Sequence, residues 1–283
     1  MDLESISLLI SRSENLPTLP KVVNTIVELA EDPNSSTKDF ERVMSTDAAI
    51  TAKVLKVASS PYYGMRQINS VSQAVGVLGM KTVKSLVIGA GFHALMEGKE
   101  TSRLFSKEKL WSHSLATGLA SRVIAKLKKP GHAEEMYCAG MLHDIGLLVL
   151  DRFAPAQLDL AIKMAEEEGF SLWQAETLLF DFTHCAVGAL LAEKWKLADV
   201  LTAVIRHHHD QRPSTEYSFE VAIVSLANTM AHRAGFTNCT PHQTPEYDEA
   251  VCETVGLPME QLEVIEDVVK QEVFKAGETF GLK

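Results

Sequence analysis

The pair His143-Asp144, in the run MLHDIGLLVL, puts a nitrogen ligand and an oxygen ligand side by side on a predicted helix. Three further imidazoles follow at His207, His208 and His209. Imidazole nitrogens together with a carboxylate are typical ligands of divalent transition metals. The sequence therefore predicts a metal site of mixed nitrogen and oxygen ligands around this pair.

Several histidines lie on an apolar or small-residue face of a predicted helix, where residues three and four apart share one side. They are His113, His143, His184, His208 and His209. Burying one neutral imidazole without a partner costs about 2 kcal/mol, so each ring needs a hydrogen bond or a share in a cation. A bond to a carbonyl is the commoner arrangement for one histidine, but five inward rings around one His-Asp pair favour a shared metal.

The small residues beside His113 indicate how such rings could meet. His113 shares its face with Ala116, Thr117 and Ala120, which are small enough to let another helix approach closely. His207 lies on the shoulder of its helix and is the weakest member of its triplet. The remaining histidines are interpreted as structural or solvated, and they are His93, His132, His232 and His242.

Composition describes an ordinary folded chain of 283 residues with 46% hydrophobic and 23% charged residues. Its 37 acidic and 27 basic residues give a formal charge of −10, which repels phosphate backbones and disfavours nucleic-acid binding. Four cysteines form no Cys-x-x-Cys pair, which indicates reduced structural thiols. No basic leader precedes an apolar segment, and no uncharged stretch approaches the roughly 20 residues of a membrane span. We expect a cytoplasmic protein without a membrane partner.

Apolar residues recur with helical spacing along nearly the whole chain, and alternating runs rich in β-branched residues are scarce, so the fold is predicted to be all-α. The polar segment from Glu97 to Glu108 is the expected internal boundary. Two packed helical lobes are therefore predicted, at residues 1–108 and 109–283. Cap and break signals predict individual helices from Asp47 to Ala58, from Val71 to Leu78 after Ser70, and from Thr37 as a cap onwards.

Longer stretches of the chain resemble the HDOD domain, the HD-related output domain of bacterial signalling proteins, within the HD metal-dependent phosphohydrolase superfamily. The first lobe carries LPTLPKVV, STDAAITAKVLKVASSPYYG and SVSQAVGVLGMKTVKSLVIG. The second lobe carries LWSHS, MLHDIG, DFTHCAVGALLAEKW, VIRHHHD and IVSLANTM. The resemblance runs from about Leu16 to the C-terminus and implies an HDOD-type N-terminal lobe followed by an HD-like helical bundle.

The resemblance also implies a ligand set. In catalytic relatives such as the HD-GYP phosphodiesterases, matching positions bind two or three iron or other transition-metal ions that activate water against a phosphodiester. Asp144 would bridge two metals, and His143 and Asp144 would be the catalytic residues. Residues matching the ligand positions are His113, His143, Asp144, His184, His208, His209 and, at the late position, Asn228.

Three departures from the catalytic pattern weaken the case for hydrolysis. Asn228 stands where the enzymes have an aspartate, so it offers one neutral oxygen instead of a charge. Leu147 follows Gly146 where those enzymes have a phosphate-contacting lysine. The Gly-Tyr-Pro segment expected after the histidine pair is also missing, since Asp210 leads into residues 211–214 instead.

Two functions stay open at this stage. The favoured one is a signal-transduction output module that docks protein partners and keeps part of the metal site. The other is a metal-dependent phosphohydrolase with a metal-activated water, and a nucleotide or phosphate ligand between the lobes is a further alternative. For either function we expect up to one equivalent of iron, zinc, manganese or nickel.

Overall fold

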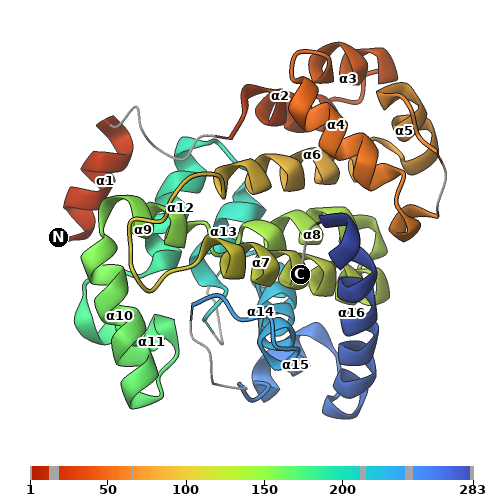
Figure 1. Ribbon diagram of the computed structural model, residues 1–283. Coiled ribbons are helices and arrows are strands. Elements are labelled where there is room, and N and C mark those ends of the chain that lie inside the picture. The colour runs from red at the N-terminus through yellow and green to blue at the C-terminus, as the bar shows by residue number, and fades with distance from the viewer. Residues whose placement is uncertain (1, 13–18, 65–66, 211–214, 240–244, 281–283) are drawn as a thin grey trace. The chain divides into compact units, whose positions relative to one another are not determined.

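The structure is a computed structural model that describes residues 2–12, 19–64, 67–210, 215–239 and 245–280. Every regular element within these ranges is a helix (Figure 1). The all-α prediction is confirmed. The chain forms helices because apolar residues recur every three to four positions, which gives each helix one face that can be buried.

Contacts within the chain divide it into two compact units. The first unit combines Met1–Pro17 with Gly98–Val269, and the second combines Thr18–Glu97 with Lys270–Lys283. Each unit combines two segments that are separated in the sequence, a grouping that hydrophobic periodicity along the chain does not reveal. The division into lobes at residue 108 stays a prediction.

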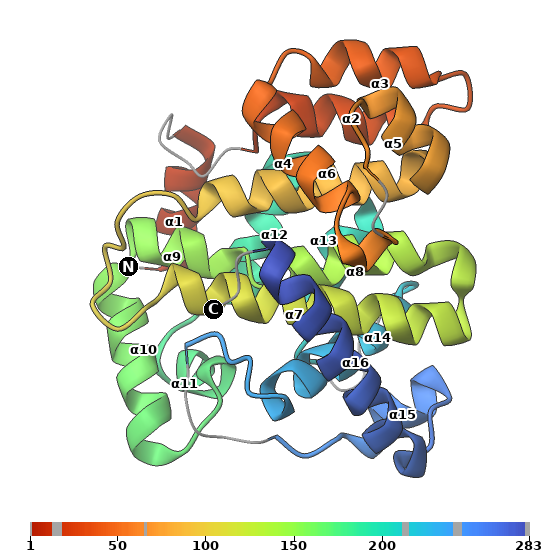
Figure 2. The ribbon, with the colours of Figure 1, turned by 45° about the vertical axis from the view of Figure 1, so that its right-hand side comes forward.

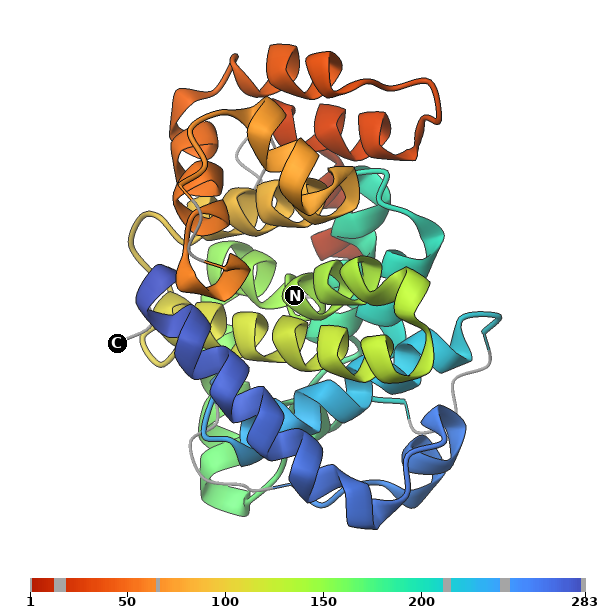
Figure 3. The same cartoon turned by 90° about the vertical axis from the view of Figure 1, so that its right-hand side faces the viewer.

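The second unit places α6 against α2, α4 and α5 (Figure 3). Ser70 caps α5 as predicted, because its hydroxyl accepts a hydrogen bond from the backbone N–H of Gln73 at 3.1 Å. The predicted cap at Thr37 is wrong by one residue. Ser36 is the cap, and Asp39 accepts the backbone N–H of Ser36 at 3.0 Å. Its helices are α2 (Lys21–Glu31), α3 (Thr37–Met44), α4 (Ala48–Ala58), η1 (Pro61–Tyr63), α5 (Val71–Leu78) and α6 (Met80–Leu95).

The first unit is built around the long helix α7, which lies beside α8 and α14 (Figures 1 and 2). The last helix, α16 (Met259–Phe280), begins in this unit and ends in the other. The remaining helices of the first unit are α1 (Leu3–Arg12), α7 (Lys107–Lys128), η2 (Pro130–His132), α8 (Ala133–Leu142), α9 (Gly146–Phe153), α10 (Pro155–Glu168), α11 (Leu172–Leu179), α12 (His184–Lys194), α13 (Asp199–His207), α14 (Ser218–Arg233) and α15 (Glu249–Val255).

Two carboxylates fix the irregular segment that leads into α7. Asp151 accepts hydrogen bonds from the backbone N–H groups of Thr101 and Ser102, both at 2.8 Å. Asp159 accepts the Ser102 hydroxyl at 2.6 Å and the Arg103 N–H at 2.9 Å. Because these donors would otherwise lack helical partners, the two carboxylates tie the start of α7 to α9 and α10.

No single helix within the described residues is long and apolar enough to cross a membrane. Helices α11 and α12 pass that test only as a pair, on length and composition, and they meet at a bend of 93°.

Candidate metal centre

His143 and Asp144 lie in the turn that joins α8 to α9, which corrects the prediction that they share an uninterrupted helix. Helix α8 ends at Leu142, and the N–H of Ile145 bonds to the carbonyl of Leu142 at 3.1 Å. Neighbouring side chains on a helix point about 100° apart. The turn instead directs both side chains toward one buried point, where neither is exposed to solvent.

Glycines bring the helices that carry the site unusually close together. A Cβ on Gly140 of α8 would lie 2.8 Å from the Cα of Gly118 on α7. A Cβ on Gly146 would lie only 1.9 Å from the carbonyl oxygen of His184 and 2.8 Å from the backbone nitrogen of Gly188. Because backbone atoms cannot move aside, these two positions accept no side chain. The lack of side chains at Gly140 and Gly146 lets α7, α8, α9 and α12 converge.

Four imidazoles surround the carboxylate of Asp144. The Nε2 atoms of His113 and His143 lie 3.6 Å and 3.3 Å from Oδ2. The Nε2 atoms of His184 and His208 lie 3.2 Å and 3.4 Å from Oδ1. Residues almost a hundred positions apart in the sequence therefore meet around one aspartate. We call His113, His143, Asp144, His184 and His208 the histidine–aspartate cage.

The other ring nitrogen of each cage histidine faces an oxygen acceptor. His113 Nδ1 lies 2.7 Å from the Phe236 carbonyl, and His143 Nδ1 lies 2.7 Å from the Gly140 carbonyl. An oxygen can only accept, so each Nδ1 carries the hydrogen and each neutral ring keeps its lone pair on Nε2. The same arrangement holds for His184 Nδ1 with Glu176 Oε2 at 2.7 Å and His208 Nδ1 with the Ile205 carbonyl at 3.0 Å.

The cage therefore gathers lone pairs that have no hydrogen to share. Four Nε2 acceptors face two carboxylate oxygens, and Oδ1 of Asp144 is buried without a hydrogen-bond partner. Oδ2 receives one amide hydrogen, from Asn238 at 2.7 Å. Buried acceptors that face one another are stabilised only by positive charge at their centre. The donor set fits a divalent transition metal, with nitrogen and carboxylate ligands already oriented by their outer hydrogen bonds.

In the metal-free protein, protons supply part of this charge. Burial alone would lower the pKa of His208, but the neighbouring Cys185 thiolate and Asp144 raise it to about 10. His184 follows the same pattern, because Cys185 and Glu176 outweigh burial and raise its pKa well above the usual value. Burial opposes ionisation of Asp144, yet the surrounding histidines hold its pKa well below the usual range. A metal would therefore compete with protons for the cage.

Three other imidazoles, His113 within the cage and His209 and His232 beside it, stay neutral. Burial and the nearby rings of His232 and His143 lower the pKa of His113 well below its usual value. Burial and the rings of His208 and His184 do the same for His209. The pKa of His232 falls to about 4 because the ring is buried. Neutral imidazoles are the form that binds metal or accepts a proton from water.

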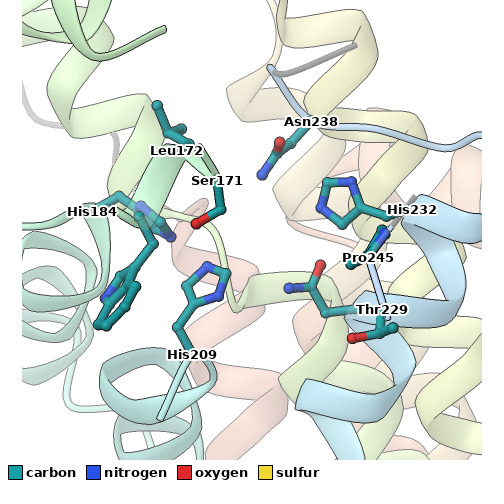
Figure 4. Close-up of a pocket in the computed structure, with 10 residues that line it drawn as sticks. Ser171, Leu172, His184, His209, Thr229, His232, Asn238 and Pro245 are labelled. Atoms are coloured by element: carbon teal, nitrogen blue, oxygen red, sulfur yellow. The ribbon is translucent and has the colours of Figure 1, made fainter. Parts of the chain in front are cut away.

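A cavity of about 130 Å³ opens beside the cage (Figure 4). His184 and His209 lie on one side of it, and His232 and Asn238 lie on the other. Asn228 also lines the cavity, and its buried Oδ1 has no hydrogen-bond partner. The full lining is Ser171, Leu172, Trp173, His184, His209, Asn228, Thr229, His232, Asn238 and Pro245.

Every predicted ligand thus lies in the cage or on this cavity, and its role as a metal ligand stays a prediction. His209 is outside the cage, with its ring centroid 4.3 Å from that of His208 and 5.2 Å from that of His184. His207 points elsewhere, since its Nδ1 lies 2.7 Å from Asp210 Oδ2. This agrees with its interpretation as the weakest member of the triplet.

Sequence analysis missed four residues of the site. His232 was set apart as structural or solvated, yet its ring centroid lies 4.6 Å from that of His113 and it lines the cavity. Cys185 lies against two cage histidines, Glu176 anchors His184, and Asn238 bonds to Asp144. Only His232 carried a signal, because it lies one helical turn after Asn228 on α14.

The three departures from the catalytic pattern have different structural outcomes. Leu147 is fully buried, so α9 offers no cation there. Asn228 occupies the expected position beside the cavity as a neutral side chain. The segment 211–214, which replaces the expected Gly-Tyr-Pro sequence, lies outside the described residues.

The fold and the cage define an all-α protein with a buried histidine–aspartate centre. A family model for the HDOD domain matches residues 16–211, and the chain belongs to the HDOD family. Among curated proteins, an uncharacterized protein of Treponema pallidum (strain Nichols) is 26% identical over 220 residues. That match covers 77% of this chain and 42% of the relative, so the chain spans about two-fifths of that relative's length.

Solved structures share the fold over nearly the whole chain. An HDOD domain protein from Geobacter sulfurreducens is 24% identical with a TM-score of 0.80, covering 98% of this chain and 99% of that one. A "Putative phosphohydrolase" from Shewanella amazonensis SB2B is 21% identical with a TM-score of 0.75, covering 98% of both chains. A "Putative signal transduction protein" from Marinobacter aquaeolei VT8 is 22% identical with a TM-score of 0.77, covering 99% of this chain and 62% of that one.

Proposed function

We propose that this chain is a metal-binding regulatory module of the HDOD type, which relays a signal by docking protein partners. The observation that carries the metal part is the orientation of the cage. Four Nε2 atoms face Asp144, and the outer hydrogen bonds on Nδ1 leave each neutral ring with a lone pair on Nε2. This arrangement is costly without a cation and favourable with one.

The lack of Lys and Arg side chains among the described residues that line the cavity supports a regulatory module over an enzyme. The lining contains no Lys or Arg among the residues that the structure describes. Phosphoryl chemistry depends on cationic groups that neutralise the charge developing on phosphate oxygens. Asn228 and Leu147 remove further charge from this region.

A second candidate is a metal-dependent phosphohydrolase, and the cavity itself favours it. The cavity reaches His184 of the cage and presents the neutral imidazoles of His209 and His232 to whatever enters. Those rings can accept a proton from water, while the Asn238 amide keeps the Asp144 carboxylate in place. A bound divalent cation would supply electrophilic activation at this point. The names of the Shewanella and Marinobacter relatives are compatible with hydrolase and signalling roles respectively.

Elemental analysis of untagged protein, as purified and after reconstitution, tests the metal centre. We expect up to one equivalent of iron, zinc, manganese or nickel in the wild type and in His207→Ala, which alters a ring outside the cage. Asp144→Asn should lose most of the metal, because it removes the only carboxylate in the cage. Metal-free wild type after reconstitution, or full loading of Asp144→Asn, would contradict the proposal.

Hydrolysis assays separate the two functions. An aryl phosphodiester and cyclic dinucleotides are incubated with wild type and His143→Ala in the presence of several divalent metals. Turnover that His143→Ala abolishes would favour the phosphohydrolase. No turnover by metal-loaded wild type would favour the regulatory module, whose protein partner can then be sought by comparing complexes formed by loaded and metal-free protein.

A further inference from the structure

Cys185 brings a sulfur atom to the cage, next to the rings that face Asp144 Oδ1. It is the second residue of α12, and it is only 2% exposed. Its Sγ lies 3.5 Å from His184 Nε2 and 3.8 Å from His208 Nε2. These are the same two nitrogens that lie 3.2 Å and 3.4 Å from Asp144 Oδ1.

Three of the four distances are those between neighbouring ligands of a tetrahedral metal site. Zinc binds nitrogen and oxygen at about 2.0–2.1 Å and sulfur at about 2.3 Å, so tetrahedral neighbours lie about 3.3 Å apart for two light atoms and about 3.6 Å for sulfur and nitrogen. The two nitrogen–oxygen distances of 3.2 Å and 3.4 Å match the first value, and the 3.5 Å between Cys185 Sγ and His184 Nε2 matches the second. Cys185 Sγ lies 3.8 Å from Nε2 and 4.0 Å from Nδ1 of His208, so it lies beside that ring, which must turn for its Nε2 to share a cation with the sulfur.

Hydrogen bonding from a thiol does not account for the same arrangement. A thiol has one weak hydrogen to donate, whereas two Nε2 lone pairs and the unpartnered Oδ1 of Asp144 all lie around this point. Donation to one nitrogen would leave the other nitrogen and Oδ1 to be satisfied by additional protons on the His184 and His208 rings. A cation bound to all four atoms satisfies every one of them.

We propose that Cys185 is a metal ligand and that His184, Cys185, His208 and Asp144 form a sulfur-containing subsite selective for zinc over manganese. This inference rests on the metal centre of the proposed function and specifies its chemistry. A thiolate is a soft ligand that zinc accepts and manganese disfavours. Binding releases the thiol proton to solvent. His209 lies on the cavity side of the subsite, and His113 and His143 face the other oxygen of Asp144.

The test uses cobalt as a spectroscopic substitute for zinc in the full-length chain. Wild type loaded with Co²⁺ should show a thiolate-to-cobalt charge-transfer band in the near ultraviolet, and Cys185→Ser should lose it. Cys252→Ser is the matched control, because Cys252 is also buried but lies on α15, with its Sγ 3.7 Å from Met259 Sδ. The control should keep the band.

Metal preference gives a second readout. Competition with a chelator should show that Cys185→Ser lowers the affinity for zinc at least about tenfold more than the affinity for manganese. Equal losses for the two metals would contradict a sulfur ligand. Because Cys185→Ser changes a buried side chain, X-ray absorption of zinc-loaded wild type provides a measurement without substitution. A sulfur neighbour at about 2.3 Å supports the proposal, and a shell of nitrogen and oxygen alone overturns it.

The outcomes separate this inference from the proposed function. Cobalt or zinc bound without a sulfur signature would refute the role of Cys185 and leave the histidine–aspartate centre intact. Failure of the wild type to bind any of these metals would refute both.

Discussion

Glu176 anchors His184 without belonging to the cage, so replacing it tests whether outer hydrogen bonds prepare the metal centre. Its Oε2 accepts the backbone N–H of His184 at 2.9 Å and the ring Nδ1–H at 2.7 Å, and its side chain is 1% exposed. Glu176→Gln keeps the size of the side chain but removes its charge. We expect the affinity for zinc to fall about 10–100-fold, or about 1.4–2.7 kcal/mol, because the imidazole becomes a weaker base.

The size of the loss in zinc affinity depends on how the amide of the new glutamine is oriented. If its oxygen faces Nδ1, the hydrogen stays there and only the charge is lost, which gives the lower value. If its NH₂ group faces Nδ1, the hydrogen moves to Nε2 and His184 ceases to be a ligand. The larger loss then applies. Nuclear magnetic resonance of the imidazole nitrogens distinguishes the two tautomers.

Affinity is measured at fixed pH by competition with a chromogenic chelator, and circular dichroism checks that the helices are retained. Glu193→Gln is the control, because Glu193 is an exposed glutamate whose only described ion pair is with Arg206 at 2.6 Å. It should bind zinc like wild type. An affinity of Glu176→Gln within about twofold of wild type, with helicity unchanged, would refute the argument that Glu176 prepares His184 for metal.

Two further predictions concern protons and packing. The pKa of His208 is raised to about 10 in the metal-free protein, so its stabilising contribution is fully present below the unfolded value of 6.5 and is lost as pH rises toward 10. Metal must displace that proton and the one on His184, so zinc affinity should rise at least about tenfold per pH unit between pH 6 and 8, and calorimetry in buffers of different ionisation enthalpy should detect the release of protons. Gly146→Ala should lower the free energy of unfolding in urea by more than about 3 kcal/mol, because its Cβ would overlap the His184 carbonyl. Gly131→Ala, whose Cβ meets nothing within 4 Å, should stay within about 0.5 kcal/mol of wild type, and equal effects at both positions would contradict the packing argument.

The histidines of the cage could be predicted from sequence because each lies beside small or apolar residues. His113 follows this rule most clearly, since Gly140 of α8 packs against Thr117 on the same face and against the neighbouring Gly118. Helix spacing fixes which side of an element a residue occupies, and burial of that side follows from its neighbours. Such reasoning needs no knowledge of which helices meet. The helix pattern predicted which residues belong to the cage but not how they are arranged.

The outer residues could not be predicted because they depend on contacts between segments that sequence alone does not pair. Glu176 precedes His184 by eight residues across a break between α11 and α12, a separation with no characteristic pattern. Asn238 lies in an irregular segment after α14 and reaches Asp144 across 94 residues. Cys185 was assigned a structural role from the spacing of the cysteines. Regular cysteine spacing can indicate a zinc knuckle, but it cannot indicate a single thiol that lies beside a cluster of histidines.

The metal centre and the packing of the first unit depend on the same contact. Gly146 follows the His143-Asp144 turn directly, and its missing side chain lets α9 lie against the start of α12. That contact sets the distance between Asp144 and His184, which come from opposite sides of it. A larger residue at this position would move Asp144 away from His184 and would also move α9 away from α12. The glycine of the MLHDIG run is therefore required by the cage geometry whether or not the centre carries out hydrolysis.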